Sequence, residues 1–546
     1  MTINYFRSEN DLATTEAGMS VGTPMIGGPI DILLIYTRLG SFDIAIRDIP
    51  LSLVHCATES VKRGYRVEIL DMRLSPKTWR EDLQAHLRRG AKLAGLSVMT
   101  GNGIREALAV SAEIKAHFPE LPIVWGGPHP TICPEQTLAD PLIDYIVMDG
   151  GSIPLHQLMV HAAGKDVPLE SIKGLGYKEN GQIIINQRQT SFEFLEFDDL
   201  PFHLVDINGK NYNRLDNGEV SFPFFTSVGC PYQCTFCNAP VVYSKVAGKR
   251  WLGLDEIKII DNIEKAYKRY NFTRIQIMDD DTFVKRERML AILQGFIDRG
   301  LNKKIKIDIR GVRINEFLDM DDAYMSTMEE AGVEMMAIGV ESGSDRILRG
   351  MKKNITRVQI VAANRRLARH PKLRPHYNFF CGTPGETYED LLMTKDLLVQ
   401  LIEENPRCYI GVGSDWKPLP GSEMTTQAVD QYGLKLPAAL KDWANVDSFD
   451  GKRPYFPWYT PKINRLIPVL QIAGQVLDCK VIDFRDNIHT PLGRLLYRAI
   501  QIYRPILRLR LRYNFTRFLF EYSIRNWATK NMGYFIGKKT TPRYVT

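Results

Sequence analysis

The chain has 546 residues, too many for one hydrophobic core, so we expect about three domains of roughly 100–200 residues each. Hydrophobic residues make up 44% and charged residues 24% of the sequence, which excludes a disordered protein, a fibrous protein and a membrane protein with several spans. The sequence has no apolar run of about 18 residues and no signal peptide, so we expect a cytoplasmic protein.

The net charge of +7 is distributed unevenly along the chain. Residues 451–546 contain 18 Lys and Arg against 4 Asp and Glu, whereas residues 1–450 contain 52 against 59. The C-terminal part is also rich in aromatic side chains. A mixture of arginines and aromatics suits an anionic surface.

An N-terminal arm at residues 1–28 is followed by short apolar runs that alternate with amphipathic stretches over residues 29–165. We predict strands at 31–36, 66–70, 93–97, 123–125 and 145–148, and helices at 51–63, 78–89 and 103–117. This alternation predicts a doubly wound, Rossmann-like parallel sheet. Its ligand should lie beyond the C-terminal strand ends, in the loops after Tyr36, Ser97, Trp125 and Met148. Each of these loops could equally be only a tight turn.

Residues 166–215 have a mixed pattern that we interpret as a linker. They include a hairpin-like piece at 174–186, with Asn180-Gly181 as its turn. An acidic stretch that contains proline follows the hairpin.

A second alternating series spans residues 216–425. We predict its strands at 222–226, 274–278, 306–309, 335–340, 376–380 and 409–414. Six such units predict a partial (β/α)6 barrel whose chemistry takes place at the C-terminal ends of the strands.

Three of the eight cysteines lie within eight residues, in Cys230-Pro-Tyr-Gln-Cys-Thr-Phe-Cys237. Three thiolates can bind three irons of a four-iron cluster and leave the fourth iron open. The alternatives are chance clustering, or a zinc ion with a distant fourth ligand, because residues 238–241 offer none. The other cysteines lack pairwise spacing, so we expect buried thiols and no second cluster.

This loop, with Phe236 just before the last cysteine, resembles the signature of the radical S-adenosylmethionine (SAM) enzymes. The resemblance implies that Cys230, Cys234 and Cys237 hold a 4Fe–4S cluster whose open iron binds the amino and carboxylate groups of SAM. It also implies that one electron cleaves SAM to methionine and a 5′-deoxyadenosyl radical. That radical abstracts hydrogen from an unactivated carbon.

Four further segments resemble family motifs in order and spacing. They are Asp279-Asp-Asp-Thr-Phe283, Gly339-Val-Glu-Ser-Gly-Ser344, Gly382-Thr-Pro-Gly-Glu-Thr387 and Pro418-Leu-Pro-Gly-Ser422. The resemblance implies that SAM contacts Phe236, Asp280, Asp281, Arg310, Arg313, Glu341, Ser342, Gly382 and Pro384. A carboxylate would accept from the methionine ammonium group, and either Arg310 or Arg313 would pair with the methionine carboxylate. Each segment alone could be an ordinary cap, but four in series behind the cysteine loop are more specific.

A Rossmann-like domain in front of such a barrel resembles the cobalamin-binding subclass, and the resemblance covers residues 28–425. It implies cobalamin contacts at Ser97, Thr100, Gly126, Gly127, His129, Asp149 and Gly150. Two departures stand out: Gly150-Gly151-Ser152-Ile153 replaces the usual Gly-Glu-x-Glu, and no Asp-x-His-x-x-Gly segment is present. Cobalamin would therefore bind without that histidine, and we expect His129 to donate or accept a hydrogen bond rather than to ligate cobalt.

Residues 426–546 are predicted to form a mostly helical basic domain. Between Leu495 and Phe515, apolar residues at helical spacing alternate with arginines. Such a helix either lies on an anionic bilayer or caps the barrel with a solvated basic face. RNA binding is a third interpretation, but no RNA-binding module is recognisable, so we do not expect a nucleic-acid partner.

Together these features predict a cobalamin-dependent radical SAM enzyme, similar to the class B methyltransferases. We expect it to methylate an unactivated carbon of a hydrophobic small molecule such as a lipid or tetrapyrrole. We also expect an external electron donor, such as flavodoxin or ferredoxin, and a cytoplasmic location that includes the inner face of the membrane. The alternatives are a radical cyclase or oxidoreductase of the same architecture, and a non-catalytic iron–sulfur sensor or scaffold. The sequence identifies no catalytic residue beyond the cofactor contacts.

Overall fold

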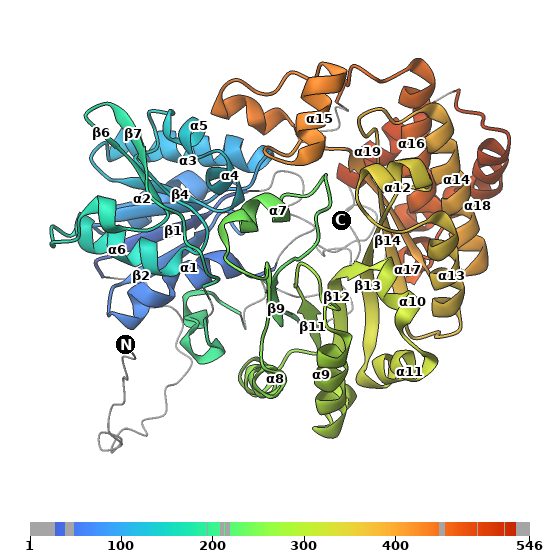
Figure 1. Cartoon of the computed structure of the whole chain (residues 1–546), viewed down its shortest axis with the longest axis horizontal. Helices are drawn as coiled ribbons and strands as arrows, with labels where there is room; N and C mark the ends of the chain where they lie inside the picture. Colours follow the sequence, from blue (N-terminus) through green and yellow to red (C-terminus); the bar gives the residue numbers. More distant parts are fainter. Residues whose placement is uncertain are drawn as a thin grey trace.

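The computed structural model describes residues 28–38, 48–193, 195–207, 212, 219–446, 454–486, 488, 490–517 and 519–530. Apart from Gly28, the predicted N-terminal arm lies outside these residues. Two sheets lie side by side along the long axis of the molecule, and the helices of residues 461–512 lie beyond the second sheet (Figure 1).

The first sheet has seven strands in the order β2-β1-β3-β4-β5-β6-β7. Their bounds are β1 (Ile32–Tyr36), β2 (Val67–Asp71), β3 (Leu93–Ser97), β4 (Ile123–Gly126), β5 (Tyr145–Val147), β6 (Leu175–Glu179) and β7 (Gln182–Ile185). Strands β1 to β5 are parallel, and the β6–β7 hairpin is antiparallel to β5. This arrangement confirms the predicted Rossmann-like sheet.

Helices cover both faces of this sheet, which explains why its strands are apolar on both sides. The helices are α1 (Leu51–Lys62), α2 (Trp79–Leu87), α3 (Asn102–His117), α4 (Pro128–Ile132), α5 (Pro134–Leu138) and α6 (Ser152–Ala162). Side chains of α2 and α3 pack in one core, and those of α1 and α6 pack in the other.

The β6–β7 hairpin comes from the segment that the sequence assigns to a linker. Asn180 and Gly181 have φ of 51° and 78°, as a tight two-residue turn requires. The hairpin itself is therefore as expected, but its pairing with β5 is not. Leu175 and Tyr177 are buried against the sheet in this pairing.

The second sheet has six parallel strands in chain order, as the predicted partial barrel requires. The strands are β8 (Ser221–Phe224), β11 (Arg274–Ile277), β12 (Lys306–Arg313), β13 (Val333–Glu341), β14 (Arg374–Cys381) and β15 (Tyr409–Asp415). Its helices are α8 (Glu256–Tyr270), α9 (Arg286–Asp298), α10 (Ile314–Asp319), α11 (Asp322–Ala331), α12 (Asp345–Gly350), α13 (Arg357–Ala368) and α14 (Tyr388–Glu404). A hairpin absent from the sequence prediction, β9 (Ser227–Gly229) with β10 (Trp251–Gly253), flanks the cysteine loop and the short helix α7 (Ala239–Val242).

The two faces of the barrel sheet differ in chemistry. Alternate residues such as Ile275, Ile309 and Phe379 pack in the core under the outer helices. Most of the intervening positions, which point to the inner face, are polar or small: Gln276, Arg310, Ala337, Gly339, His376, Asn378, Gly411 and Gly413. Met335 and Phe380 are large apolar exceptions.

The C-terminal part attaches to both sheets. It contains α15 (Glu423–Tyr432), the 3₁₀ helix η7 (Leu440–Asn445), α16 (Pro461–Val476), α17 (Lys480–Asp486), α18 (Pro491–Arg512) and α19 (Phe520–Lys530). η7 packs on α3 of the first sheet, whereas α16 packs on β15 and α14 of the barrel. Across the ranges that the structure describes, no helix has the length and apolar character needed to cross a membrane.

Candidate functional site

Cys230, Cys234 and Cys237 lie in one loop at the C-terminal end of the first barrel strand. All three thiols are half-buried and none forms a disulfide. Thr235 anchors the loop, because its N–H donates to Met351 O (3.2 Å) and its carbonyl accepts from Met424 N (2.8 Å). In the described part of the chain no three ligating side chains converge as a single metal ion would need. A four-iron cluster does not need that convergence, since each cysteine binds a different iron.

The thiols are held in a partly polar environment. Burial, with Asp281 and Asp280 nearby, raises the pKa of Cys230 to about 12. The Cys234 Sγ accepts from Arg313 Nη1 at 3.3 Å, and the Cys237 Sγ accepts from Ala239 N at 3.4 Å. Positive irons favour thiolates, so this set of donors fits an iron–sulfur cluster.

The three consecutive aspartates after β11 have different surroundings. Asp279 is buried and accepts from Thr226 N (2.7 Å) and Ser227 Oγ (2.8 Å), so it fixes the end of β8. Burial raises the pKa of Asp279 to about 6. Asp281 is buried against Glu316, and burial raises the pKa of both carboxyl groups.

Only Asp280 of the three is exposed. Its Oδ2 accepts from Tyr243 Oη at 2.7 Å, and Tyr243 follows the cysteine loop. Asp280 is therefore the aspartate whose position fits an ammonium group bound beside the cluster.

Glu341 closes β13 in a left-handed conformation, with φ of 70°. Its buried carboxylate pairs with Lys353 Nζ at 2.9 Å. A Cβ at Gly339 would overlap both groups, so a side chain at this position would displace the pair. The Lys353 ammonium also lies 5.8 Å from the Phe236 ring, which connects the end of β13 to the cysteine loop. Ser342 is buried, and its hydroxyl accepts from Ser344 N at 3.2 Å.

The turn after β14 is held from two directions. The Gly382 carbonyl accepts from Trp458 Nε1 at 3.1 Å, and the Gly382 and Thr383 N–H groups donate to Glu386. Burial raises the pKa of Glu386 to about 8. Pro384 is half-buried in this turn. Because Gly382 has φ of 81° and packs against Tyr459, a side chain could not be accommodated.

The two candidate arginines are separated. The Arg313 guanidinium lies 3.8 Å from the Tyr232 ring and donates to Cys234 Sγ and to the Lys353 carbonyl, beside the cysteine loop. Arg310 is on the inner face of the barrel, where its Nη2 lies 3.4 Å from Gln276 Oε1.

The loops after β3 and β4 contact each other. Val98 N donates to the Gly126 carbonyl (2.8 Å), and His129 N donates to the Val98 carbonyl (3.2 Å). Ser97, Thr100, Gly126 and Gly127 remain partly accessible. Gly127 has φ of 96° and backs against Val98. These accessible backbone surfaces fit a flat ligand such as a corrin.

His129 is fully buried between these loops and the C-terminal part. Its Nδ1 lies 3.0 Å from Thr100 Oγ1, and its ring lies 5.9 Å from the Trp443 ring. Burial lowers the pKa of His129 to about 4, so the imidazole is neutral at pH 7. A corrin contact from His129 remains a prediction.

Two residues of the supposed linker complete the loop at 149–153. Arg188 pairs with Asp149, which has φ of 63°, and also donates to the Val242 carbonyl at 2.7 Å. The Glu193 carboxylate accepts from Ser152 N (3.1 Å) and Ile153 N (3.2 Å), close against Gly150. Residues 150–153 contain no glutamate, unlike the usual Gly-Glu-x-Glu, and the carboxylate at this loop comes instead from Glu193. No local pattern could have identified Arg188 or Glu193.

The two predicted cofactor sites are adjacent. Arg188 links Asp149 of the first sheet to Val242, next to the cysteine loop. The Gly421 turn after β15 packs between Ile132 of α4 and Val241 of α7.

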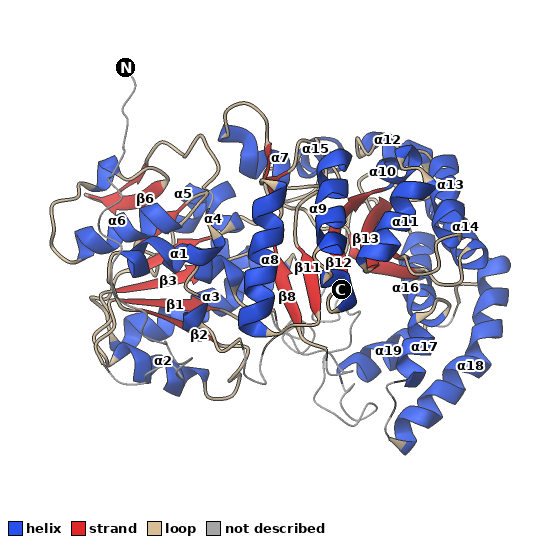
Figure 2. Ribbon diagram, turned by 90° about the horizontal axis from the view of Figure 1, so that it is seen from below, coloured by secondary structure: helices blue, strands red, loops and turns tan. Residues whose placement is uncertain are grey.

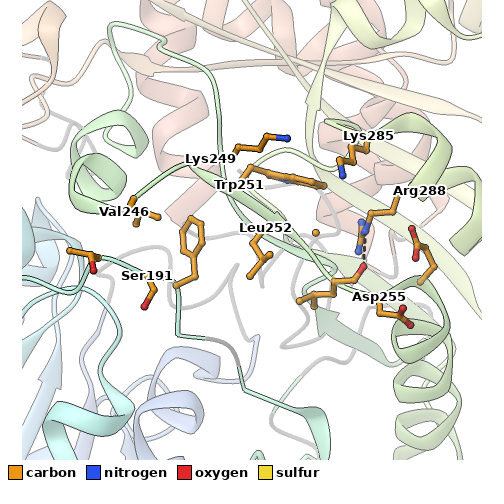
Figure 3. Close-up of a pocket in the computed structure, with 14 residues that line it drawn as sticks. Ser191, Val246, Lys249, Trp251, Leu252, Asp255, Lys285 and Arg288 are labelled. Atoms are coloured by element: carbon orange, nitrogen blue, oxygen red, sulfur yellow. Dashed lines mark hydrogen bonds between the residues drawn. The ribbon is translucent and has the colours of Figure 1, made fainter. Parts of the chain in front are cut away.

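A separate pocket of about 700 Å³ lies beside the β9–β10 hairpin (Figure 3). Its lining includes Phe192, Lys249, Trp251, Lys285 and Arg288, and no residue predicted to contact a cofactor. The Lys285 ammonium lies 5.8 Å from the Trp251 ring. The pocket is therefore distinct from the two cofactor sites.

Comparison with known families agrees with this geometry. Residues 224–398 match the model of the radical SAM superfamily, and residues 46–158 match that of the B12 binding domain. An uncharacterized methyltransferase of Pyrococcus horikoshii is 26% identical over 402 residues, which cover 73% of this chain and 82% of the relative. An anaerobic magnesium-protoporphyrin IX monomethyl ester cyclase of Synechocystis is 24% identical, over 56% of this chain and 59% of the cyclase.

Among solved structures, the cobalamin-dependent SAM radical enzyme OxsB superposes with a TM-score of 0.65 at 18% identity. The match covers 94% of this chain and 77% of OxsB. At this identity the similarity establishes the fold, including the helical C-terminal part.

Proposed function

Since the chain belongs to the radical SAM superfamily and carries a B12-binding domain, we propose that it methylates an unactivated carbon of a hydrophobic substrate. Its cofactors are a 4Fe–4S cluster, SAM and cobalamin, which supply the 5′-deoxyadenosyl radical and the methyl group when bound. The observation that carries the proposal is the link from Asp149 through Arg188 to Val242, because it joins the 149–153 loop of the first sheet to the segment next to the cysteine loop.

The residues of the chain would have the following roles in binding the cofactors. Cys230, Cys234 and Cys237 hold the cluster, and Asp280 accepts from the methionine ammonium. Arg313, already in contact with Cys234, is the arginine placed to pair with the methionine carboxylate. Glu341 and the Gly382–Pro384 turn border the nucleoside, and the loops at Ser97, Gly126 and Asp149 hold the corrin. An external donor such as flavodoxin or ferredoxin supplies electrons.

The proposal of a hydrophobic substrate is supported by an exposed apolar stripe on α18. One stripe of this helix is apolar and exposed: Leu492, Leu495, Ile502, Ile506 and Leu509. Exposed arginines flank the stripe, and residues 487–546 contain 12 Lys and Arg against a single acidic residue, Glu521. Figure 2 shows α18 at the end of the molecule away from the first sheet. A helix of this kind suits an anionic bilayer, with apolar side chains inserted and arginines at the headgroups.

The bilayer contact is tested with Ile502→Glu, whose side chain is 70% exposed. We expect the free energy of unfolding to change by less than about 0.5 kcal/mol, and co-sedimentation with phosphatidylglycerol vesicles to fall at least tenfold. Arg369→Glu, which changes the charge by more but lies on the barrel, is the control. Unchanged co-sedimentation of the Ile502 variant would remove the bilayer contact from the proposal.

The methyltransferase proposal is tested on protein purified without oxygen from cells supplied with cobalamin. We expect about four irons and one cobalt per chain, and reductive SAM cleavage that yields S-adenosylhomocysteine as well as 5′-deoxyadenosine. Iron without cobalt after reconstitution would contradict methyl transfer.

A radical cyclase is the second candidate, because one relative is an anaerobic cyclase. It predicts 5′-deoxyadenosine without S-adenosylhomocysteine. The same assay therefore separates the two candidates.

A further inference from the structure

Arg310 lies at a β-bulge in β12, and its side chain is on the inner face of the barrel. Ile309 pairs with Met336 and Val312 pairs with Ile338, so β12 has one residue more than β13 between these pairs. A bulge of this kind re-aims a side chain and is common beside active sites. At Gly311 a Cβ would overlap the backbone of Asp279 and Asp280, so the bulge is packed directly against the aspartate loop.

The Arg310 guanidinium is poorly satisfied. Its Nε is buried without a hydrogen-bond partner, and its Nη2 has only the 3.4 Å contact with Gln276. In the described ranges of the chain no carboxylate pairs with it. A half-buried guanidinium without an anion is unfavourable, whereas one that meets a carboxylate or phosphate forms strong paired hydrogen bonds.

The acidic groups on the strands near Arg310 are already paired with other side chains, so a carboxylate or phosphate for Arg310 would have to come from a ligand. Asp308 on the same strand pairs with Arg274, and Glu341 pairs with Lys353. His376 on β14 is buried, and burial, with Lys480 and Arg310 nearby, lowers the pKa of its imidazole to about 3. Asp308, Glu341 and His376 are thus paired or neutral, and none of them supplies an anion to Arg310.

Part of the inner face beside Arg310 is open. Ala337 and Gly413 are accessible, and a Cβ at Gly413 would meet only the Phe379 carbonyl, at 3.5 Å. The side chains of Asn378 and His376 fill the space at Gly411; Asn378 is partly accessible, whereas His376 is buried.

We propose that Arg310 binds a carboxylate of the substrate on the inner face of the barrel, with Asn378 beside it. This inference rests on the proposed hydrophobic substrate and refines it: the substrate is an amphipathic acid. Arg313 serves SAM at the cysteine loop, and Arg310 serves the substrate.

The test uses holoenzyme and two matched pairs of probes. Protoporphyrin IX is compared with its dimethyl ester, and oleate with oleyl alcohol, by fluorescence or competition titration. We expect the acid of at least one pair to bind at least tenfold more tightly than its neutral partner. Arg310→Gln should abolish that preference, Arg310→Lys should retain part of it, and the surface variant Arg369→Gln should keep it in full.

Three results would overturn the proposal. They are the absence of any acid preference in the wild type, a preference that persists in Arg310→Gln, and a tenfold loss of SAM affinity in Arg310→Gln. The last would place Arg310 at the methionine carboxylate. Formation of S-adenosylhomocysteine by the wild type is measured separately, and tight binding of a neutral probe would leave the hydrophobic-substrate proposal intact.

Discussion

The strand ends of the two sheets are stabilised in different ways. In the barrel, the ends of β11 and β13 are held by other parts of the same barrel, since Asp279 accepts from Ser227 and Glu341 pairs with Lys353. In the first sheet, the loops are held by Arg188 and Glu193 from beyond the hairpin and by Trp443 from the C-terminal part. The aspartate loop and the end of β13 therefore depend on the barrel itself, whereas the cysteine loop and the Gly382 turn also take hydrogen bonds from Met424 and Trp458 of the C-terminal part. The first-sheet loops at 126–129 and 149–153 depend on segments outside the predicted Rossmann-like domain.

The largest effect is expected from Cys234→Ala, which should abolish cluster binding and SAM cleavage. If the two sites are stabilised independently, cobalt content should remain at the wild-type level. Iron and cobalt analysis of the purified variant checks both points. Cys133→Ala, which removes a half-buried thiol outside the loop, is the control and should retain about four irons.

Trp443→Ala should destabilise the first-sheet loop that contains His129, although Trp443 is far from it in the sequence. Trp443 is buried, packs on His129 and donates to Gln136 Oε1 at 2.6 Å. We expect a loss of about 4 kcal/mol in the free energy of unfolding, and less cobalt with unchanged iron. Trp443→Phe keeps the ring contact and should cost only about 1 kcal/mol. Equal losses of cobalt and iron would argue against separate stabilisation of the two sites.

Lys353→Met should destabilise the barrel by about 3 kcal/mol, because it leaves the Glu341 carboxylate buried without its partner. The double variant Glu341→Gln with Lys353→Met should recover most of this loss. Urea unfolding of the wild type, both single variants (Lys353→Met and Glu341→Gln) and the double variant measures the coupling. Additive effects would show that the pair contributes nothing as a pair.

Glu386 should give the barrel a pH dependence. Its pKa is raised by burial to about 8, above the 4.5 of an unperturbed glutamate. Between these values the folded state holds a proton that the unfolded state has released, so stability falls as pH rises, by at most about 1.4 kcal/mol per pH unit. Glu386→Gln should remove this fall. The free energy of unfolding of the variant, measured with urea, should change less between pH 5 and 8 than that of the wild type. A parallel curve for the variant would contradict the raised pKa.

Much of the fold and part of the site could be predicted from the sequence. The alternation of apolar runs and amphipathic stretches predicted both sheets, because burial between helices imposes that pattern locally. The cysteine spacing indicated the cluster loop in the same way, since one loop carries all three ligands. By contrast, the 174–186 hairpin was recognisable from Asn180-Gly181, but its place at the edge of the first sheet was not.

By itself, therefore, the sequence determined the two α/β units, their order, the cysteine loop and the cofactors that its motifs imply. Only the tertiary structure decided that Asp280 is the accessible aspartate, that Glu193 and Arg188 complete the first-sheet loop, and that Arg310 and Arg313 face different surroundings. The physical reason is that spacing along the chain specifies local elements. Which side chains are buried, paired or left open depends on contacts between elements far apart in the sequence.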